Sequence, residues 1–132
     1  MQRNERLIWC LMALSGAITV MVGAYATHGL AARVTAELVH AVETGVRYQA
    51  WHTLAIMAVL IGQRVFGFKG WQWPVALWGL GMVGFSGSLY AMAMAGWNVG
   101  IVTPIGGALL IAGWLMLAVA VLRSPLLKPL TK

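Results

Sequence analysis

The sequence predicts an all-α membrane protein: a four-transmembrane-helix bundle with a short amphipathic interfacial helix between spans one and two. Hydrophobic residues make up 61% of the 132 residues, and only 9% are charged. A soluble domain carries roughly 25% charged residues. The few charges also fall between long apolar runs. Such a chain cannot cover a water-facing surface, which excludes an ordinary soluble enzyme and a disordered segment. We expect residues 1–132 to form a single membrane domain.

Charge-free stretches define the spans. They cover residues 7–32, 48–63 and 70–122. A helix needs about 20 apolar residues to cross the hydrocarbon core, so the first two stretches hold one span each. The third holds two, divided at residues 96–100, where two glycines and an asparagine favour a turn. The predicted spans are residues 7–26, 48–66, 73–95 and 103–122.

Proline and its neighbours mark the helix boundaries. Pro74 lies where a helix can begin without losing a hydrogen bond. Thr103 is a typical N-cap residue, and Pro104 follows it. Ser124-Pro125 is expected to end the last span.

The first span has an alternative interpretation as a signal peptide. Arg3 and Arg6 precede an apolar stretch that ends in Ala24-Tyr25-Ala26, which resembles a cleavage site. The apolar stretch is longer than the ~7–15 residues usual for a signal core. We therefore expect it to be retained as a transmembrane helix.

Lysine and arginine predict the orientation. With four spans, the N-terminus, the second loop and the C-terminus share one side and carry seven basic residues, whereas the opposite side carries Arg33 and Arg47. Cytoplasmic loops are enriched in basic residues. We therefore predict a multi-pass protein of the inner (cytoplasmic) membrane with both termini in the cytoplasm. The net charge of +6 includes no basic run, and no nucleic-acid partner is expected. The seven residues are Arg3, Arg6, Arg64, Lys69, Arg123, Lys128 and Lys132.

Residues 30–46 have the pattern of the interfacial helix. Polar side chains recur in steps of three and four, which places them on one helical face. Arg33–Glu37 and Glu43–Arg47 are spaced as i,i+4 ion pairs. We expect this helix to lie in the outer interface and to bend at Gly45 into the second span.

The candidate functional residues gather at the predicted outer side, where polar groups at membrane depth are costly and often functional. One interpretation is a metal or proton site built from His28, His40, His52 and Glu43. The other is that each histidine bonds a helix end and holds the loop helix down. No HxxxH or HExxH pair is present, so no metal or cofactor is predicted, and His28 and His52 are the candidates if a metal binds. The full candidate cluster is His28, His40, Glu43, Arg47, Tyr48, His52, Ser86, Ser88, Tyr90 and Thr103.

Small residues predict close helix packing, because small faces let backbones approach in membranes. This packing is expected within one bundle; the alternatives are a seam between copies or a lined pore. The predicted packing residues are Gly23, Gly84, Gly87, Ala91, Gly106 and Gly113.

The sequence matches none of the catalytic residue patterns considered, and no catalytic residue is predicted. The chain contains no Asp, and its glycines lie in apolar segments rather than in a phosphate-binding loop. The single cysteine, Cys10, excludes a disulfide scaffold. The spans carry no carboxylate, which argues against a proton-coupled exporter.

Four stretches together resemble a known family: residues 23–30, residues 43–49 with His52, residues 85–90, and residues 103–107 running to Gly113-Trp114. This combination is similar to the YgdD/YwdK-type family of small bacterial inner-membrane proteins, a domain-of-unknown-function family with mitochondrial relatives. The resemblance covers nearly the whole chain and implies four transmembrane helices and no established activity. The first motif departs from the family pattern, because Tyr25, Ala26 and Thr27 replace Phe, Gly and Ala.

The function predicted from these observations is that of a non-enzymatic accessory or assembly component. It would pack in the lipid bilayer with other membrane proteins or with a second copy of itself. The first alternative is a small oligomeric transporter or channel, and the second is a metal-, haem- or quinone-related site at the outer leaflet. An acid–base enzyme built on His52–Tyr48 or His40–Glu43 ranks below these.

Overall fold

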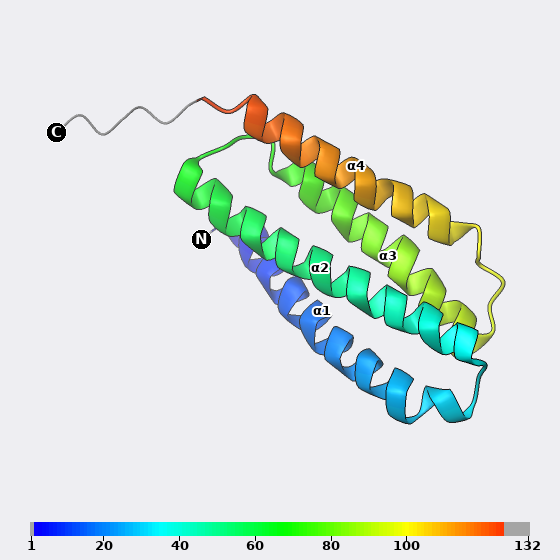
Figure 1. Ribbon diagram of the computed structural model, residues 1–132. Coiled ribbons are helices and arrows are strands. Elements are labelled where there is room, and N and C mark those ends of the chain that lie inside the picture. The colour runs from blue at the N-terminus through cyan, green and yellow to red at the C-terminus, as the bar shows by residue number, and fades with distance from the viewer. Residues whose placement is uncertain (1, 126–132) are drawn as a thin grey trace.

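The computed structural model describes residues 2–125, and this part of the chain is helical without any strand. Consecutive long helices run antiparallel, and the start of α1 and the end of α4 lie at the same end of the molecule (Figure 1). Lys128 and Lys132, which the sequence assigns to the cytoplasmic side, lie outside the described residues. The helices are α1 Arg3–His28, the short 3-10 helix η1 Leu30–Ala32, α2 Ala36–Phe66, α3 Gln72–Ala95 and α4 Val102–Leu122.

The helix boundaries follow the residues that mark them in the sequence. Pro74 lies in the first turn of α3, and Pro104 lies in the first turn of α4. Gly67 ends α2 with a φ of 68°, and Gly96 ends α3 with a φ of 67°. This left-handed conformation favours glycine, which lacks the Cβ that would clash there.

Within residues 2–125, three helical segments are long and apolar enough to cross a membrane: Arg3–Ala32, Gln72–Ala95 and Val102–Leu122. They contain the first, third and fourth predicted spans. Helix α2, which contains the predicted second span, is not among them. Its many polar side chains lower its hydropathy.

The structure does not contain the predicted interfacial helix as a separate element. Instead, η1 is followed by Thr35, whose hydroxyl caps α2 by accepting a bond from the Leu38 N–H at 3.4 Å. Helix α2 then runs 31 residues without a break at Gly45. Val42 and Leu30 are buried in a cluster with Ala26 and Ala93. These apolar contacts hold the first part of α2 to the bundle.

The two predicted i,i+4 ion pairs are also absent from residues 2–125. Glu43 lies instead beside His40, with Oε2 3.8 Å from Nδ1, and both side chains are largely exposed. Arg33 lies outside α2, at the end of η1, so it does not share a helical face with Glu37.

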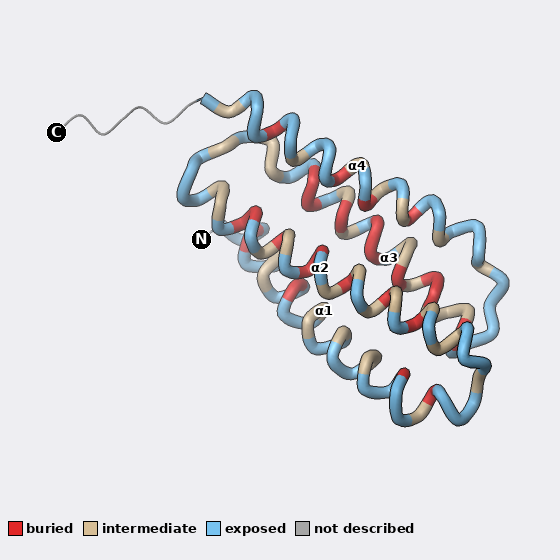
Figure 2. Tube along the Cα trace, viewed as in Figure 1, coloured by how far each residue is buried: buried red, intermediate tan, exposed pale blue. Residues whose placement is uncertain are grey.

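Helices α2 and α3 form the centre of the molecule, with α1 packed on α2 and α4 packed on α3 (Figure 1). Buried residues follow this pattern: they concentrate on α2 and α3, while α1 and α4 are mostly exposed (Figure 2). Trp78 is fully buried in the main apolar cluster. An exposed apolar surface of this extent fits a chain surrounded by lipid.

Glycines allow α3 and α4 to approach closely. A Cβ on Gly106 would lie 2.2 Å from the Phe85 backbone nitrogen, and a Cβ on Gly84 would lie 3.0 Å from the Gly106 Cα. A Cβ on Gly113 would lie 2.4 Å from the Trp78 ring. This contact depends on glycine because any larger side chain would force the two helices apart.

Candidate functional site

A network of polar side chains connects α1, α2 and α3 inside the apolar bundle. The Gln49 amide nitrogen donates to the Ser15 hydroxyl at 3.0 Å and to the Ser15 carbonyl at 3.3 Å. The Tyr90 hydroxyl donates to the Gln49 amide oxygen at 2.7 Å. The Ser15 hydroxyl also lies 2.7 Å from the Thr53 hydroxyl. Gln49 and Thr53 are buried, so this network satisfies groups that lipid cannot solvate.

A groove of about 520 Å³ opens between α1 and α3 over this network. Gln49 and Tyr90 line its floor, and Gly79 and Gly87 belong to its α3 wall. No atom of another helix comes within 4 Å of a Cβ built on either glycine. Gly87, a predicted packing residue, therefore faces the groove rather than a neighbouring helix of this chain.

The remaining predicted packing residues differ in their contacts. A Cβ on Gly23 would lie 3.5 Å from Val46, which is ordinary van der Waals distance. Ala91 is half-buried. Gly84, Gly106 and Gly113 form the close α3–α4 contact described above.

His52 occupies the centre of an aromatic cluster between α2, α3 and α4. It is 3% exposed. Its Nδ1 lies 2.7 Å from the Tyr48 carbonyl oxygen, and its Nε2 lies 3.0 Å from the Trp114 indole nitrogen. A carbonyl only accepts and an indole N–H only donates, so Nδ1 carries the proton and Nε2 accepts. The geometry thus holds a neutral imidazole in one tautomer. The Trp78 and Trp114 rings flank it, each with its centroid 5.9 Å from that of the imidazole.

Three of the predicted hydroxyl residues bond within the bundle. Ser86 donates to the Gly45 carbonyl at 2.7 Å, which joins α3 to α2. A Cβ on Gly45 would lie 2.8 Å from the Tyr90 ring, so this glycine permits close approach instead of a bend. Ser88 and Thr103 lie 2.6 Å apart through their hydroxyls, which joins α3 to the start of α4.

The other predicted candidates do not join His52. His28 is exposed at the end of α1, and His40, Glu43 and Arg47 are exposed on the first part of α2. Within residues 2–125, no three His, Cys, Asp or Glu side chains are grouped so that they could hold a metal ion. The structure therefore does not assemble the four-residue metal site that the sequence suggested.

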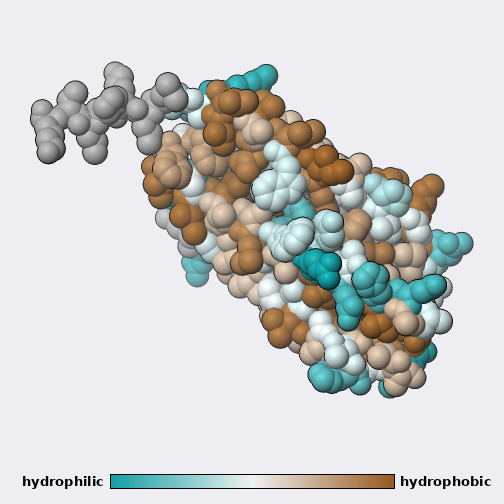
Figure 3. All heavy atoms as spheres, in the orientation of Figure 1, coloured by the Kyte–Doolittle hydropathy of each residue, from teal (hydrophilic) through white to brown (hydrophobic). Residues whose placement is uncertain are grey.

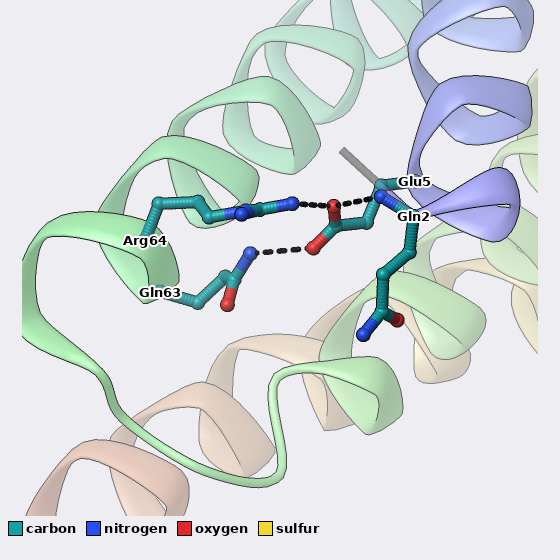
Figure 4. Close-up of polar contacts among 4 residues, drawn as sticks. All are labelled: Gln2, Glu5, Gln63 and Arg64. Atoms are coloured by element: carbon teal, nitrogen blue, oxygen red, sulfur yellow. Dashed lines mark hydrogen bonds and ion pairs between the residues drawn. The ribbon is translucent and has the colours of Figure 1, made fainter.

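A cluster at the other end of the molecule was missed by the sequence reasoning. Glu5, at the start of α1, is 6% exposed and pairs with the Arg64 guanidinium near the end of α2. Gln63 donates to the same carboxylate at 2.9 Å, and the Gln2 backbone N–H donates at 3.1 Å (Figure 4). A usable signal was present, because Glu5 is the one acidic residue on the side predicted to carry seven basic residues.

The site also contains three residues that were not predicted as candidates: Ser15, Thr53 and Trp114. Trp114 appeared in the sequence only at the end of a family motif, and Ser15 and Thr53 carried no prediction. A serine, a threonine and a glutamine within predicted apolar helices are a signal of interhelical hydrogen bonding. The sequence alone does not indicate which partner each one meets.

Comparison with known proteins identifies relatives that are described as membrane proteins. A family model described as "Protein of unknown function (DUF423)" matches residues 22–107. A UPF0382 membrane protein of Haemophilus influenzae is 40% identical over 115 residues, covering 86% of this chain and 92% of the relative. The UPF0382 inner membrane protein YgdD of Escherichia coli K12 is 35% identical over 121 residues, covering 91% and 92%.

A third bacterial relative agrees with these two. A UPF0382 membrane protein of Staphylococcus haemolyticus is 37% identical over 121 residues, covering 89% of this chain and 97% of the relative. No solved structure gives a significant match to the chain.

The matches to the family model and to the three relatives confirm the family resemblance seen in the sequence motifs. The all-helical fold with three apolar segments long enough to span a bilayer agrees with the relatives' description as membrane proteins. The chain therefore belongs to the DUF423 (UPF0382) family of membrane proteins.

Proposed function

We propose that this protein is a non-enzymatic accessory or assembly component of the inner membrane that packs against another membrane protein through the α1–α3 groove. The observation that carries the proposal is the pair Gly79 and Gly87. Glycine costs roughly 1 kcal/mol relative to alanine in a helix interior, and the fold of this chain does not need either one, since a Cβ would meet nothing. Small residues that face a membrane groove suit the close approach of another helix.

The proposal includes four spans, with α2 crossing the membrane. Helix α2 contacts α1 at three levels: Arg64 pairs with Glu5 near one end, Thr53 meets Ser15 in the middle, and Val42 shares a cluster with Ala26 near the other end. A helix that pairs with α1 over this length must cross wherever α1 crosses. With four spans, the excess of basic residues on one side supports the proposal that both termini lie in the cytoplasm.

The interior polar groups support a structural role in place of catalysis. Every buried side-chain nitrogen and oxygen in residues 2–125 has a hydrogen-bond partner. Ser88 and Thr103, two members of the predicted candidate cluster, bond each other. Transport by an oligomer is the competing function, and flux of ions or solutes through proteoliposomes that contain only this protein would favour it over the accessory role.

The test is native mass spectrometry of the protein extracted gently from its own membranes. We expect a complex with a second membrane protein for the wild type and a folded, partner-free chain for Gly87→Leu, whose larger side chain would fill the groove. The matched control is Ala118→Leu, which introduces the same side chain at an exposed position of α4 outside the groove and should keep the partner. A wild-type chain without any protein partner, or a Gly87→Leu variant that retains it, contradicts the proposal.

A further inference from the structure

A second groove lies on the opposite pair of helices, between α2 and α4. One cavity of about 420 Å³ is lined by Tyr48, His52 and Phe85, and a second of about 540 Å³ is lined by Ala55, Ala58 and Leu117. Trp114 lines both. In the space-filling view, pale and hydrophilic side chains reach into the middle of the mostly hydrophobic face over α2 and α4 (Figure 3). The groove therefore combines an apolar setting with polar groups.

The two large rings beside His52 differ in how firmly they are held. Trp78 is fully buried, packs onto Gly113, and donates to the Leu110 carbonyl at 3.2 Å. Trp114 is 48% exposed, and the one hydrogen bond of its indole goes to His52 Nε2. Rotation of Trp114 toward the lipid breaks this single bond and separates its ring from that of Trp78, whose centroid lies 4.6 Å away. Rotation of Trp78 would disrupt the core.

When Trp114 turns away, the two separated groups are an acceptor, His52 Nε2, and a donor, the indole N–H. A hydroxyl group can both donate and accept, so it can bridge the two. A carbonyl or ether oxygen only accepts, so it would leave His52 Nε2 unpaired in an apolar setting, which is costly. The hydrogen-bonding pair therefore favours a group that both donates and accepts, and a hydroxyl is the smallest such group on an apolar molecule.

The walls indicate what carries that hydroxyl. Tyr48, Trp51 and Phe85 surround the smaller cavity, with the Tyr48 and Phe85 ring centroids 5.0 Å apart and those of Tyr48 and Trp51 5.3 Å apart. Aromatic rings pack favourably on other aromatic rings in offset or tilted arrangements. Tyr48 also brings a hydroxyl for which the described residues provide no hydrogen-bond partner. The adjoining 540 Å³ cavity is apolar and could hold a hydrocarbon tail.

We propose that the α2–α4 groove binds a membrane-soluble phenol-type ring, a class that includes hydroquinones, and that its hydroxyl inserts between His52 Nε2 and the Trp114 indole N–H. The groove is separate from the α1–α3 groove assigned to the protein partner. The two proposals can therefore fail independently.

The test uses para-octylphenol and its methyl ether, para-octylanisole, which cannot donate a hydrogen bond. Purified full-length protein in lipid nanodiscs is labelled with ¹⁵N at the tryptophan indoles, and the Trp114 signal is the one that Trp114→Phe removes. We expect the phenol to shift this signal saturably and the ether to bind about tenfold more weakly, as expected for one unpaired buried group. Equal affinities, or no saturable shift, would overturn the proposal.

Two variants separate the hydroxyl contact from general apolar binding, with equilibrium dialysis of both ligands as the measurement. His52→Phe removes the acceptor and should make the phenol and the ether bind alike. Trp114→Phe removes the donor but keeps the acceptor, so the preference for the phenol should remain. Trp97→Phe, on the exposed α3–α4 loop, should change neither affinity. A preference that survives His52→Phe contradicts the assignment of His52 as the acceptor, and if that variant fails to fold, the wild-type comparison still decides.

Discussion

Individual glycines have two different roles in this chain, and their surroundings distinguish them. Gly106 lies against the α3 backbone, with space for hydrogen only, whereas Gly87 has open space around its Cα. The sequence places both on small-residue helix faces and cannot separate them. Only the positions of the neighbouring helices show that one serves the fold and the other leaves a groove.

Replacement of Gly106 by alanine should destabilise the protein. The new Cβ would overlap the Phe85 backbone, which cannot move without displacing α3, and overpacking of this kind costs about 1–3 kcal/mol. Equilibrium unfolding in mixed micelles with a denaturing detergent measures the loss. Gly87→Ala is the matched control and should be near neutral or slightly stabilising. Equal losses for the two variants would contradict the two roles.

Gln49 is the residue through which the interior network connects three helices. Gln49→Leu removes its bonds to Ser15 and to Tyr90. Interhelical hydrogen bonds in membranes average about 0.6 kcal/mol each, so we expect a loss of about 1–2 kcal/mol in unfolding free energy. Tyr90→Phe removes one of these bonds and should cost about 0.6 kcal/mol in the same assay. A Gln49→Leu protein as stable as the wild type would show that the network contributes no net stability.

Among the elements, α2 departs most from the sequence-based prediction. Pro74, Pro104 and Gly96 lie at helix ends as the sequence predicts, whereas the predicted N-cap Thr103 lies inside α4, whose cap position is Ile101 without a side-chain hydrogen bond. Thr35 and Gly67, which bound α2, were not predicted. The predicted break at Gly45 is wrong, because a glycine within a helix can mark a close contact as well as a bend. Here the contact is with Ser86 and Tyr90. Since those residues lie some 40 positions away in the chain, helical periodicity around Gly45 contains no information about them.

The continuity of α2 can be measured as a distance. Spin labels at Glu37 and Val65, introduced as cysteines in a Cys10→Ser background, would be about 42 Å apart along a straight helix with 1.5 Å rise per residue. A right-angle bend at Gly45 would reduce this separation to about 32 Å. Pulsed electron resonance in nanodiscs resolves the two values. A distribution centred on the shorter distance would contradict the continuous helix and restore the interfacial arrangement.

At the scale of the whole molecule, the arrangement is more open than a closed four-helix bundle. Each neighbouring pair in the chain packs together, and lateral grooves remain between α1 and α3 and between α2 and α4. The sequence predicted the all-helical membrane class because composition and charge spacing depend on single segments. It could not predict the grooves, which depend on how four helices pack side by side.

The packing of the helices, which the sequence could not predict, also decides which residues of the candidate cluster come together. The predicted topology places Tyr90, Ser86 and His52 on helices that pack together, and in the structure Ser86 and His52 are buried and Tyr90 is half-buried. The topology gives no information on how each helix is rotated about its own axis. That rotation leaves His28 and His40 exposed and gives His52 a tryptophan partner from α4.

Site-specific photocrosslinking in native membranes can show whether a partner helix occupies the α1–α3 groove. A photoreactive amino acid at Val83, which lines this groove and is 74% exposed, should give a discrete adduct with another membrane protein. The same group at Leu115, 64% exposed on α4 and outside both grooves, should crosslink to lipid. If Val83 gives only lipid adducts, or if both positions give the same protein bands, the groove is not the docking surface that we assign to it.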